Sequence, residues 1–300
     1  MKVVIAGAGS IGMLIGSYLQ EAAMDVAFHT RRKEQADALN REGIQRINMD
    51  GTASVFPAYA TDDIQQLPKD ALWIVSTKFA GLHGILSEMK ETKVTGPILF
   101  IQNGIAHLEL AYGSDWEQFA FATVEHGAGR LDDRTVSHNG VGSMTIAVGR
   151  GKRNVFHLLD SAVTEQFPIV FHEDAEQILM RKVLINCMIN PLTALLQVKN
   201  GELVDNCHAS SLFRQLYAEL MEAFPEFRTF LPYEAVVGVC QKTASNHSSM
   251  LADRQAGRPM EIETIVTAVI RKAESRNVSL NLLKTLERML KAVDGGGAGR

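Results

Sequence analysis

The largely apolar stretch RKVLINCMINPLTAL at residues 181–195 carries three polar side chains at a regular spacing. Lys182, Asn186 and Asn190 stand four residues apart, so on a helix they form one narrow line. An ammonium group can donate a proton and stabilise a developing negative charge, and amides can bind carboxylate or hydroxyl groups. Because burying such groups is costly unless something pairs with them, the line predicts a binding face for a polar ligand.

A purely structural interpretation of the same residues is available. Asn190 precedes Pro191 and could cap a new helix that has proline at its first position. Asn186 could cap a neighbouring backbone group, and the stem of Lys182 could carry its charge outward to water. This interpretation needs three separate roles, whereas a single polar ligand accounts for all three residues, so we favour the ligand.

A second polar stretch, TASNHSSMLADRQAGRPMEIE at residues 243–263, offers further candidates. Asn246, Ser249 and Asp253 fall at helical spacing, and a Gly-Arg-Pro break then places Glu261 at the start of another helix. Ser249 could be a plain surface hydroxyl, and Glu261 an acid favoured by the helix dipole. For Asn246 and Asp253, structural and functional roles remain equally open.

A glycine-rich turn stands at the beginning of the chain. Gly7-Ala8-Gly9-Ser10-Ile11-Gly12 follows an expected strand and opens an expected helix. In a dinucleotide-binding fold, the first glycine permits the tight turn, the second lets a pyrophosphate approach and the third lets helix and strand pack closely. An ordinary glycine turn is the alternative, but the position inside a strand–helix–strand unit favours dinucleotide binding.

The end of the second expected strand indicates which dinucleotide binds. An NAD site usually has Asp or Glu there, but this chain has Thr30-Arg31-Arg32-Lys33. Cations at a helix start oppose the helix dipole, so an anion is expected beside them. The pair Arg31 and Arg32 suits a ribose 2′-phosphate, and we predict NADP(H).

Polar residues also follow other expected strands, at the edge where ligands of open α/β sheets bind. Thr77-Lys78 follows residues 71–76, Gln102-Asn103-Gly104 follows 97–102, and Glu125-His126-Gly127 follows 119–124. Lys78 could be a surface lysine and Asn103 a turn residue. Together, these residues predict one polar rim.

The pattern of elements predicts an α/β Rossmann-type parallel sheet domain followed by an all-α helical domain. Short apolar runs alternate with amphipathic stretches, which is typical of a parallel sheet covered on both faces. Asn139-Gly140 predicts a hairpin turn within an antiparallel pair at 129–150. After residue 173 the pattern is helical, with breaks that include Pro191. The expected ranges are strands 2–6, 26–30, 71–76, 97–102, 119–124 and 168–172, and helices 10–22, 33–42, 81–91, 105–112, 152–165, 175–189, 191–198, 209–223, 232–244, 261–276 and 279–293.

We therefore expect a cofactor-binding domain at 1–173, a helical substrate and dimerisation domain at 174–293, and a flexible tail at 294–300. A net charge of −4 and the absence of a long basic cluster argue against nucleic acid and anionic membrane partners. Three scattered cysteines indicate a reducing compartment, and no apolar run is long enough to span a membrane, so a cytoplasmic protein is expected. No His/Asp/Glu cluster has metal-ligand spacing.

At these residues the sequence resembles the ketopantoate reductase (2-dehydropantoate 2-reductase) family along its whole length. The specific segments are RKVLINCMINPLTAL followed by NGEL, and NHSSMLADRQAGRPMEIE. The family's central lysine and two asparagines match Lys182, Asn186 and Asn190, and its substrate-binding serine and acidic residue match Ser249 and Glu261. One departure is Glu125, where a small or hydroxyl residue is expected, so the role of His126 stays open. The matching cofactor positions are Gly7, Gly9, Gly12, Arg31, Lys78 and Asn103.

The resemblance implies NADPH-dependent reduction of a 2-oxo acid, ketopantoate, for pantothenate and coenzyme A biosynthesis. Lys182 would polarise the carbonyl and act as the general acid, while Asn103, Asn186, Asn190 and Ser249 would bind substrate. Glu261 would hold a substrate hydroxyl and help to orient the lysine. Two alternatives remain: a reductase of another 2-oxo acid, and a non-catalytic NADP-binding sensor. A proton donor at Lys182 has no use in a sensor, which favours an enzyme.

Overall fold

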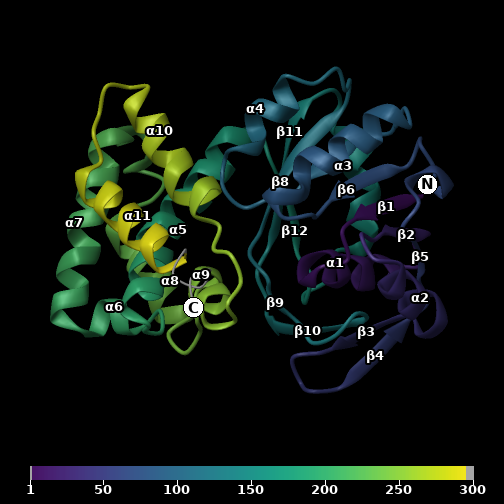
Figure 1. Ribbon diagram of the computed structural model, residues 1–300, viewed down its shortest axis with the longest axis horizontal. Coiled ribbons are helices and arrows are strands. Elements are labelled where there is room, and N and C mark those ends of the chain that lie inside the picture. The colour runs from purple at the N-terminus through teal and green to yellow at the C-terminus, as the bar shows by residue number, and fades with distance from the viewer. Residues whose placement is uncertain (1, 295–300) are drawn as a thin grey trace. The chain divides into compact units, whose positions relative to one another are not determined.

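The computed structural model describes residues 2–294 (Figure 1). Its internal contacts divide the chain into two units. The first unit contains residues up to Asn103 together with His107–Leu179, and the second contains Gly104–Ala106 together with residues from Met180 onward. This division falls inside a helix, whereas the functional division at residue 173 stays a prediction. The two units are described separately below.

An eight-stranded sheet forms the centre of the first unit. Its strand order is β12-β11-β8-β7-β6-β1-β2-β5, and the run from β5 to β8 is entirely parallel. β11 is antiparallel to β8 and parallel to β12. The Rossmann-type sheet is therefore confirmed. The strands are β1 Val3–Ala6, β2 Val26–His29, β5 Tyr59–Thr61, β6 Leu72–Val75, β7 Ile98–Phe100, β8 Phe119–Val124, β11 Met144–Arg150 and β12 Ile169–His172.

A second sheet, with order β4-β3-β10-β9, was not predicted in full. It contains β3 Ile44–Ile47, β4 Ala53–Phe56, β9 Gly127–Arg130 and β10 Thr135–Gly140. The predicted hairpin turn at Asn139-Gly140 is wrong, because Gly140 ends β10 and β11 joins the other sheet. The hairpin turns instead at residues 131–134, where Asp132 Oδ1 accepts hydrogen bonds from the backbone N–H groups of Arg134 (2.8 Å) and Thr135 (2.6 Å).

Helix α1, Ser10–Glu21, is covered by both sheets. β1 and β2 contact it from the central sheet, and β3, β9 and β10 contact it from the second sheet (Figure 1). Consequently every residue from Gly12 to Leu19 is buried. Close packing also requires a missing side chain at Gly16, where an added Cβ would lie 2.2 Å from Cζ of Phe28. The helix that carries the glycine turn is thus fixed from two sides.

The remaining helices of the first unit lie between strands. They are α2 Lys33–Glu42, α3 Phe79–Glu91 and α4 His107–Tyr112. The predicted helix at 152–165 is a 3₁₀-helix, Arg153–Ala162. The buried residues Phe156, Leu159 and Ala162 are three residues apart, so the three-residue repeat of the 3₁₀-helix places them on one face toward the core.

The second unit is helical, and its longest helix differs from the prediction. α5, Ala175–Leu196, continues through Pro191 without a break. The predicted end at 189 is therefore wrong, and the alternative interpretation of Asn190 as a helix cap does not hold. Proline removes one N–H group from a helix interior, but the buried residues Met188, Ile189 and Leu192 on both sides of it hold the helix in the core. α5 is long and apolar enough to cross a membrane, but 72% of its most apolar part is buried inside the protein, as expected of a core helix.

Most other helices of this unit match the predicted ranges to within about two residues, but short helices at Glu202–Asp205 and Ser249–Gln255 had no predicted range and one segment is irregular. Residues Glu263–Thr267 form a π-helix that leads into α10, Ala268–Glu274. Asp294, which the sequence placed at the start of the flexible tail, belongs to α11 instead, and its Oδ1 accepts a hydrogen bond from the backbone N–H of Met260 (3.2 Å). Residues 295–300 lie outside the described part. The remaining helices are α6 Glu202–Asp205, α7 Cys207–Ala223, α8 Tyr233–Lys242, α9 Ser249–Gln255 and α11 Asn281–Asp294.

Candidate functional site

The glycine turn between β1 and α1 leaves no room for side chains at two of its positions. Gly7 has φ = +112°, and a Cβ added at Gly12 would lie 2.1 Å from the Gly7 carbonyl oxygen. Ser76, which follows β6, donates a hydrogen bond from Oγ to that same oxygen (2.6 Å). Sequence reasoning missed Ser76, because a lone serine after a strand carries no distinctive pattern. The turn is therefore fixed by backbone fit and by one side chain from the neighbouring strand.

The start of α1 is open, in contrast to the crowded turn. A Cβ at Gly9 would meet nothing within 4 Å, and Gly9 occupies the N-cap position without a side-chain cap. Ser10 and Ile11 begin the helix and are half-buried. The first N–H groups of a helix lack partners within it and attract anions. This uncapped, uncrowded helix start fits the pyrophosphate of a dinucleotide.

The two predicted phosphate-binding arginines differ in their environments. Arg31 is exposed, and within residues 2–294 it forms no ion pair. Arg32 donates from Nη2 to Oδ1 of Asp133, which also accepts from Nη2 of Arg130. The residue types alone suited both arginines to the phosphate, and the family resemblance pointed to Arg31; the structure commits Arg32 to an internal carboxylate.

The polar rim at the strand ends is braced by one of its predicted members, Gln102, to which the sequence assigned no particular contact. Gln102, at the end of β7, is buried and donates from Nε2 to the carbonyl oxygens of Val75 (2.8 Å) and Thr77 (3.1 Å). This amide ties the β7 end to the segment that leads to Lys78. Lys78 is the exposed N-cap residue of α3, and Asn103 follows the brace directly.

His126 belongs to a buried chain of polar rings. Its Nδ1 lies 3.2 Å from Nε2 of His138, and Nδ1 of His138 lies 2.8 Å from the hydroxyl of Tyr18. The ring of His126 also stacks on Phe167. Burial, assisted by the neighbouring His138, lowers the pKa of His126 to about 4. The ring is therefore neutral at physiological pH, and its contacts pack it inside the first unit.

In the second unit, α5 and α9 bring two predicted site residues together. Asn190 is 3% exposed, and its Nδ2 donates to Oγ of Ser249 (3.4 Å). Next to them, Thr193 Oγ1 donates to Oγ of Ser248 (2.7 Å), and Ser248 caps α9 by accepting from the backbone N–H of Leu251. Asn186 and Lys182 stand one and two turns earlier on α5, respectively, and both are half-buried. Sequence reasoning missed Thr193 and Ser248, since adjacent serines are ambiguous without the contact.

Glu261 is positioned by the irregular helix that follows it. Its carbonyl oxygen accepts hydrogen bonds from the backbone N–H of Ile265 (3.2 Å) and from Oγ1 of Thr264 (3.3 Å). Cys187 of α5 donates from Sγ to the Ile265 carbonyl (3.3 Å), which attaches this segment to α5. π-helical turns are frequent at functional sites. Here the turn joins Glu261 to the helix that carries the polar line.

Two other candidates have structural partners. Asp253 is buried, and its Oδ1 accepts from Nε of Arg258 (2.7 Å). Asn246 lies in the turn before α9 rather than on it, and its backbone carbonyl accepts from the N–H of Asn200 (3.1 Å). These contacts favour the structural interpretation for both residues, with the backbone rather than the side chain as the important part of Asn246.

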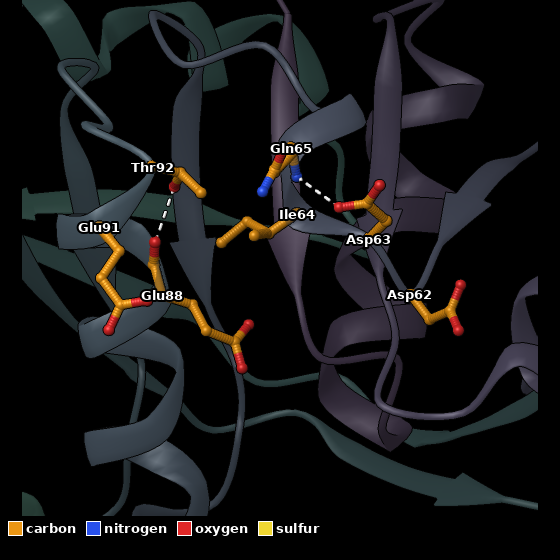
Figure 2. Close-up of a pocket in the computed structure, with 7 residues that line it drawn as sticks. All are labelled: Asp62, Asp63, Ile64, Gln65, Glu88, Glu91 and Thr92. Carbon is orange, nitrogen blue, oxygen red and sulfur yellow. Dashed lines mark hydrogen bonds between the residues drawn. The ribbon is translucent and has the colours of Figure 1, made fainter.

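A separate hollow in the first unit is lined by four carboxylates (Figure 2). Asp62 and Asp63 face it from the segment after β5, and Glu88 and Glu91 from the end of α3. Such a lining repels phosphate and carboxylate ligands, so it fits neither a dinucleotide nor an oxo acid. Within residues 2–294 no group of His, Cys, Asp and Glu side chains is arranged to hold a metal ion.

Comparison with known proteins agrees with this arrangement. The family model "Ketopantoate reductase PanE/ApbA" matches residues 3–151, and "Ketopantoate reductase PanE/ApbA C terminal" matches residues 174–294. A protein named 2-dehydropantoate 2-reductase from Listeria innocua is 36% identical over 98% of this chain and 97% of its own length.

Solved structures share the fold. The crystal structure of "Probable 2-dehydropantoate 2-reductase panE" from Bacillus subtilis is 31% identical, with a TM-score of 0.87 over 98% of this chain and all of that one. D-mandelate dehydrogenase, solved with NADH and anilino(oxo)acetate, has a TM-score of 0.84 at 22% identity over 98% of each chain. The second likeness concerns the fold alone. The family models and the closely related sequences show that this chain belongs to the ketopantoate reductase family of oxidoreductases.

Proposed function

We propose that this protein reduces 2-dehydropantoate (ketopantoate) to pantoate with NADPH. In this proposal residues 1–173 bind the cofactor, and residues 174–293 bind the substrate and supply the proton. The observation that carries the proposal is the joining of Asn190 to Ser249 beside the polar line of α5. Family membership supports the reaction type, and names of relatives such as the Listeria innocua protein support the substrate.

The first unit offers the groups that a bound NADPH requires. Bound NADPH would supply a hydride from its nicotinamide ring. Gly7, Gly9, Ser10, Ile11 and Gly12 would hold the pyrophosphate at the uncapped start of α1. The exposed guanidinium of Arg31 would pair with the 2′-phosphate. Lys78 and Asn103 would contact the cofactor from the braced strand ends, and Asn103 would also face the substrate.

Lys182 is assigned the general-acid role. When the carbonyl carbon of the 2-oxo acid accepts a hydride, the electron pair of the C=O bond moves to its oxygen. Lys182 Nζ stabilises that developing charge and donates a proton to the oxygen, which gives the 2-hydroxy acid. The neutral amine then recovers a proton from water, so each turnover consumes one hydride and one proton.

The remaining polar side chains would bind the other polar groups of the substrate. Ser249, Asn186 and Asn190 would donate hydrogen bonds to the carboxylate and hydroxyl groups. The Glu261 carboxylate, which only accepts, would hold the 4-hydroxyl of ketopantoate. A site built around a hydroxyl strongly rejects an analogue that lacks it, because the protein group is left unpaired.

The test compares two acids in two proteins. We expect kcat/KM for ketopantoate to exceed that for 2-oxo-3-methylbutanoate, which lacks the hydroxyl, and Glu261→Ala to shrink that preference. Equal use of the two acids by the unmutated protein would replace the proposal by a general 2-oxo acid reductase. No oxidation of NADPH with either acid would favour a non-catalytic NADP-binding sensor.

Assembly and location are part of the same proposal. We propose a homodimer in the cytoplasm, where NADPH and the oxo acid are available. A ketopantoate reductase from Staphylococcus aureus with the same fold is described as dimeric, at 19% identity and a TM-score of 0.78. Sedimentation of the purified protein would test the dimer.

A further inference from the structure

One carboxylate in the first unit contacts two guanidinium groups beside the β2 end. Asp133, at the tip of the β9–β10 hairpin, accepts through a single oxygen, Oδ1, from both Arg32 and Arg130. Arg32 is the neighbour of Arg31, which the proposed function places at the 2′-phosphate of NADPH. The carboxylate therefore pairs with the residue directly after the expected phosphate-binding arginine.

The hairpin tip is also attached to the glycine turn. The Gln35 side chain donates from Nε2 both to the Ala8 carbonyl oxygen of the glycine turn (2.8 Å) and to the Asp133 carbonyl oxygen (2.9 Å). The adjacent Asp132 holds the tip through its hydrogen bonds to Arg134 and Thr135. Asp133 is thus presented from a fixed turn that is joined, through one buried amide, to the turn that would bind the pyrophosphate.

The two guanidinium groups keep the carboxyl group of Asp133 in its ionised form. The hydrogen bond from Arg32, together with the charges of Arg32 and Arg130, holds the pKa of Asp133 below its usual range. The carboxylate is therefore ionised at physiological pH. A phosphate monoester carries a charge of about −1.5 to −2 at pH 7, so the carboxylate and a 2′-phosphate repel each other and compete for the same guanidinium groups.

We propose that Asp133 is a specificity-determining residue that competes internally with the 2′-phosphate and so limits the preference for NADPH over NADH. This inference rests on the proposed function of Arg31. Asp133 keeps Arg32 and Arg130 paired, which leaves Arg31 as the main phosphate-binding group. Removing the charge of Asp133 releases both guanidinium groups toward the phosphate, and the predicted consequence is a gain in affinity rather than a loss.

The test measures binding without turnover, by calorimetric titration with adenosine 2′,5′-bisphosphate and with 5′-AMP. In Asp133→Asn we expect the Kd for the bisphosphate to fall by roughly three- to tenfold, the range of two partly exposed ion pairs. The Kd for 5′-AMP should not change, because that probe has no 2′-phosphate. Glu91→Gln, which removes one exposed negative charge from α3, is the matched control and should change neither Kd.

A double variant and three contrary outcomes complete the test. Adding Arg32→Ala to Asp133→Asn should remove most of the gain. An unchanged Kd for the bisphosphate in Asp133→Asn would overturn the inference while leaving the proposed cofactor intact. Equal weakening of both probes would overturn it as well, because Asp133 would then only hold the hairpin. If the unmutated protein does not distinguish the two probes, the NADP proposal fails and the inference falls with it.

Discussion

The glycine turn and the polar face of α5 are built in different ways. The turn consists of consecutive residues whose conformation is set by backbone fit, as the 2.1 Å approach of a Cβ at Gly12 to the Gly7 carbonyl demonstrates. The face of α5 depends on distant segments, because Asn190 meets Ser249 and Cys187 meets Ile265 across 59 and 78 residues of sequence. A local motif and a tertiary assembly therefore perform the two halves of the proposed function.

This difference predicts different responses to substitution. A change in the first region should alter cofactor affinity, whereas a change in the second should alter turnover or substrate affinity. A substitution that changed cofactor affinity and turnover together would argue against this difference between the regions. A substitution that changed only one of them would support it.

The largest effect is expected at Lys182. Replacing the proposed proton donor, in Lys182→Ala, should lower kcat by roughly 10² to 10⁴, while the Kd for NADPH stays unchanged. Steady-state kinetics and fluorescence titration with NADPH measure the two quantities. Lys242→Ala, at an exposed lysine of α8, is the control and should have ordinary kcat. Near-normal turnover in Lys182→Ala would show that Lys182 has only a structural role.

The second prediction concerns stability at acid pH, which is expected to fall in the first unit because His107 and His126 lie there. Burial lowers the pKa of His107 to about 3 and that of His126, also beside His138, to about 4. Unfolded histidine titrates near 6.5, so below that pH the unfolded state binds more protons. The free energy of unfolding is therefore unaffected by these rings at pH 7 and falls as pH drops from about 6.5 toward 4. At pH 5 the loss is about 2 kcal/mol for the fully buried His107 and smaller for His126, whose ring is partly screened by solvent.

Tryptophan fluorescence isolates this effect. Trp73 and Trp116 are the chain's two tryptophans, and both lie in the first unit, whereas His208 and His247 of the second unit are exposed. Urea unfolding followed by this signal should show lower stability at pH 5 than at pH 7. His107→Leu should flatten the dependence, since it removes one buried titrating ring. A pH-independent transition in the unmutated protein would refute the prediction.

The third prediction compares neighbouring arginines. Arg31→Ala should raise the KM for NADPH about ten- to a hundredfold, the loss of a charge-assisted hydrogen bond worth about 1.5–3 kcal/mol, and should leave the KM for NADH unchanged. Arg32→Ala should have a smaller effect, because Asp133 already engages Arg32. If the two variants were equally impaired with NADPH, the structural distinction between the arginines would lose its functional meaning.

The smallest effect is expected at the cap of α9. Ser248→Ala removes the hydrogen bonds to Leu251 and Thr193, and loss of such a cap costs about 1 kcal/mol. We expect a lower Tm and a higher KM for the oxo acid with an unchanged KM for NADPH. Ser211→Ala on the exposed side of α7 is the matched control. A change in the KM for NADPH alone would contradict the assignment of α9 to the substrate.

The sequence predicted the central sheet because its strands are apolar runs that end at polar residues, and local patterns of this kind survive folding. It failed at Pro191, where burial of the surrounding helix outweighs the missing N–H group. It also misplaced the hairpin, because Asp132 stabilises a turn at 131–134 that has no Asn-Gly signal.

For the site, too, the sequence predicted some features and missed others. Residue types identified Lys182, Asn186, Asn190, Ser249 and Glu261 as candidates, and the structure joins Asn190 to Ser249. The pairing of Arg32 with Asp133 spans 101 residues, and the brace made by Gln102 depends on which strand ends are neighbours. Neither contact has a periodicity or a motif, so only the folded arrangement reveals it.

The central claim is tested most directly by measuring kcat/KM for ketopantoate with NADPH and with NADH on one preparation of the unmutated protein. The account predicts turnover to pantoate, with NADPH favoured about tenfold or more by the 2′-phosphate contact. Equal values for the two cofactors would contradict the assignment of Arg31, and the absence of turnover with either would contradict the proposed enzyme.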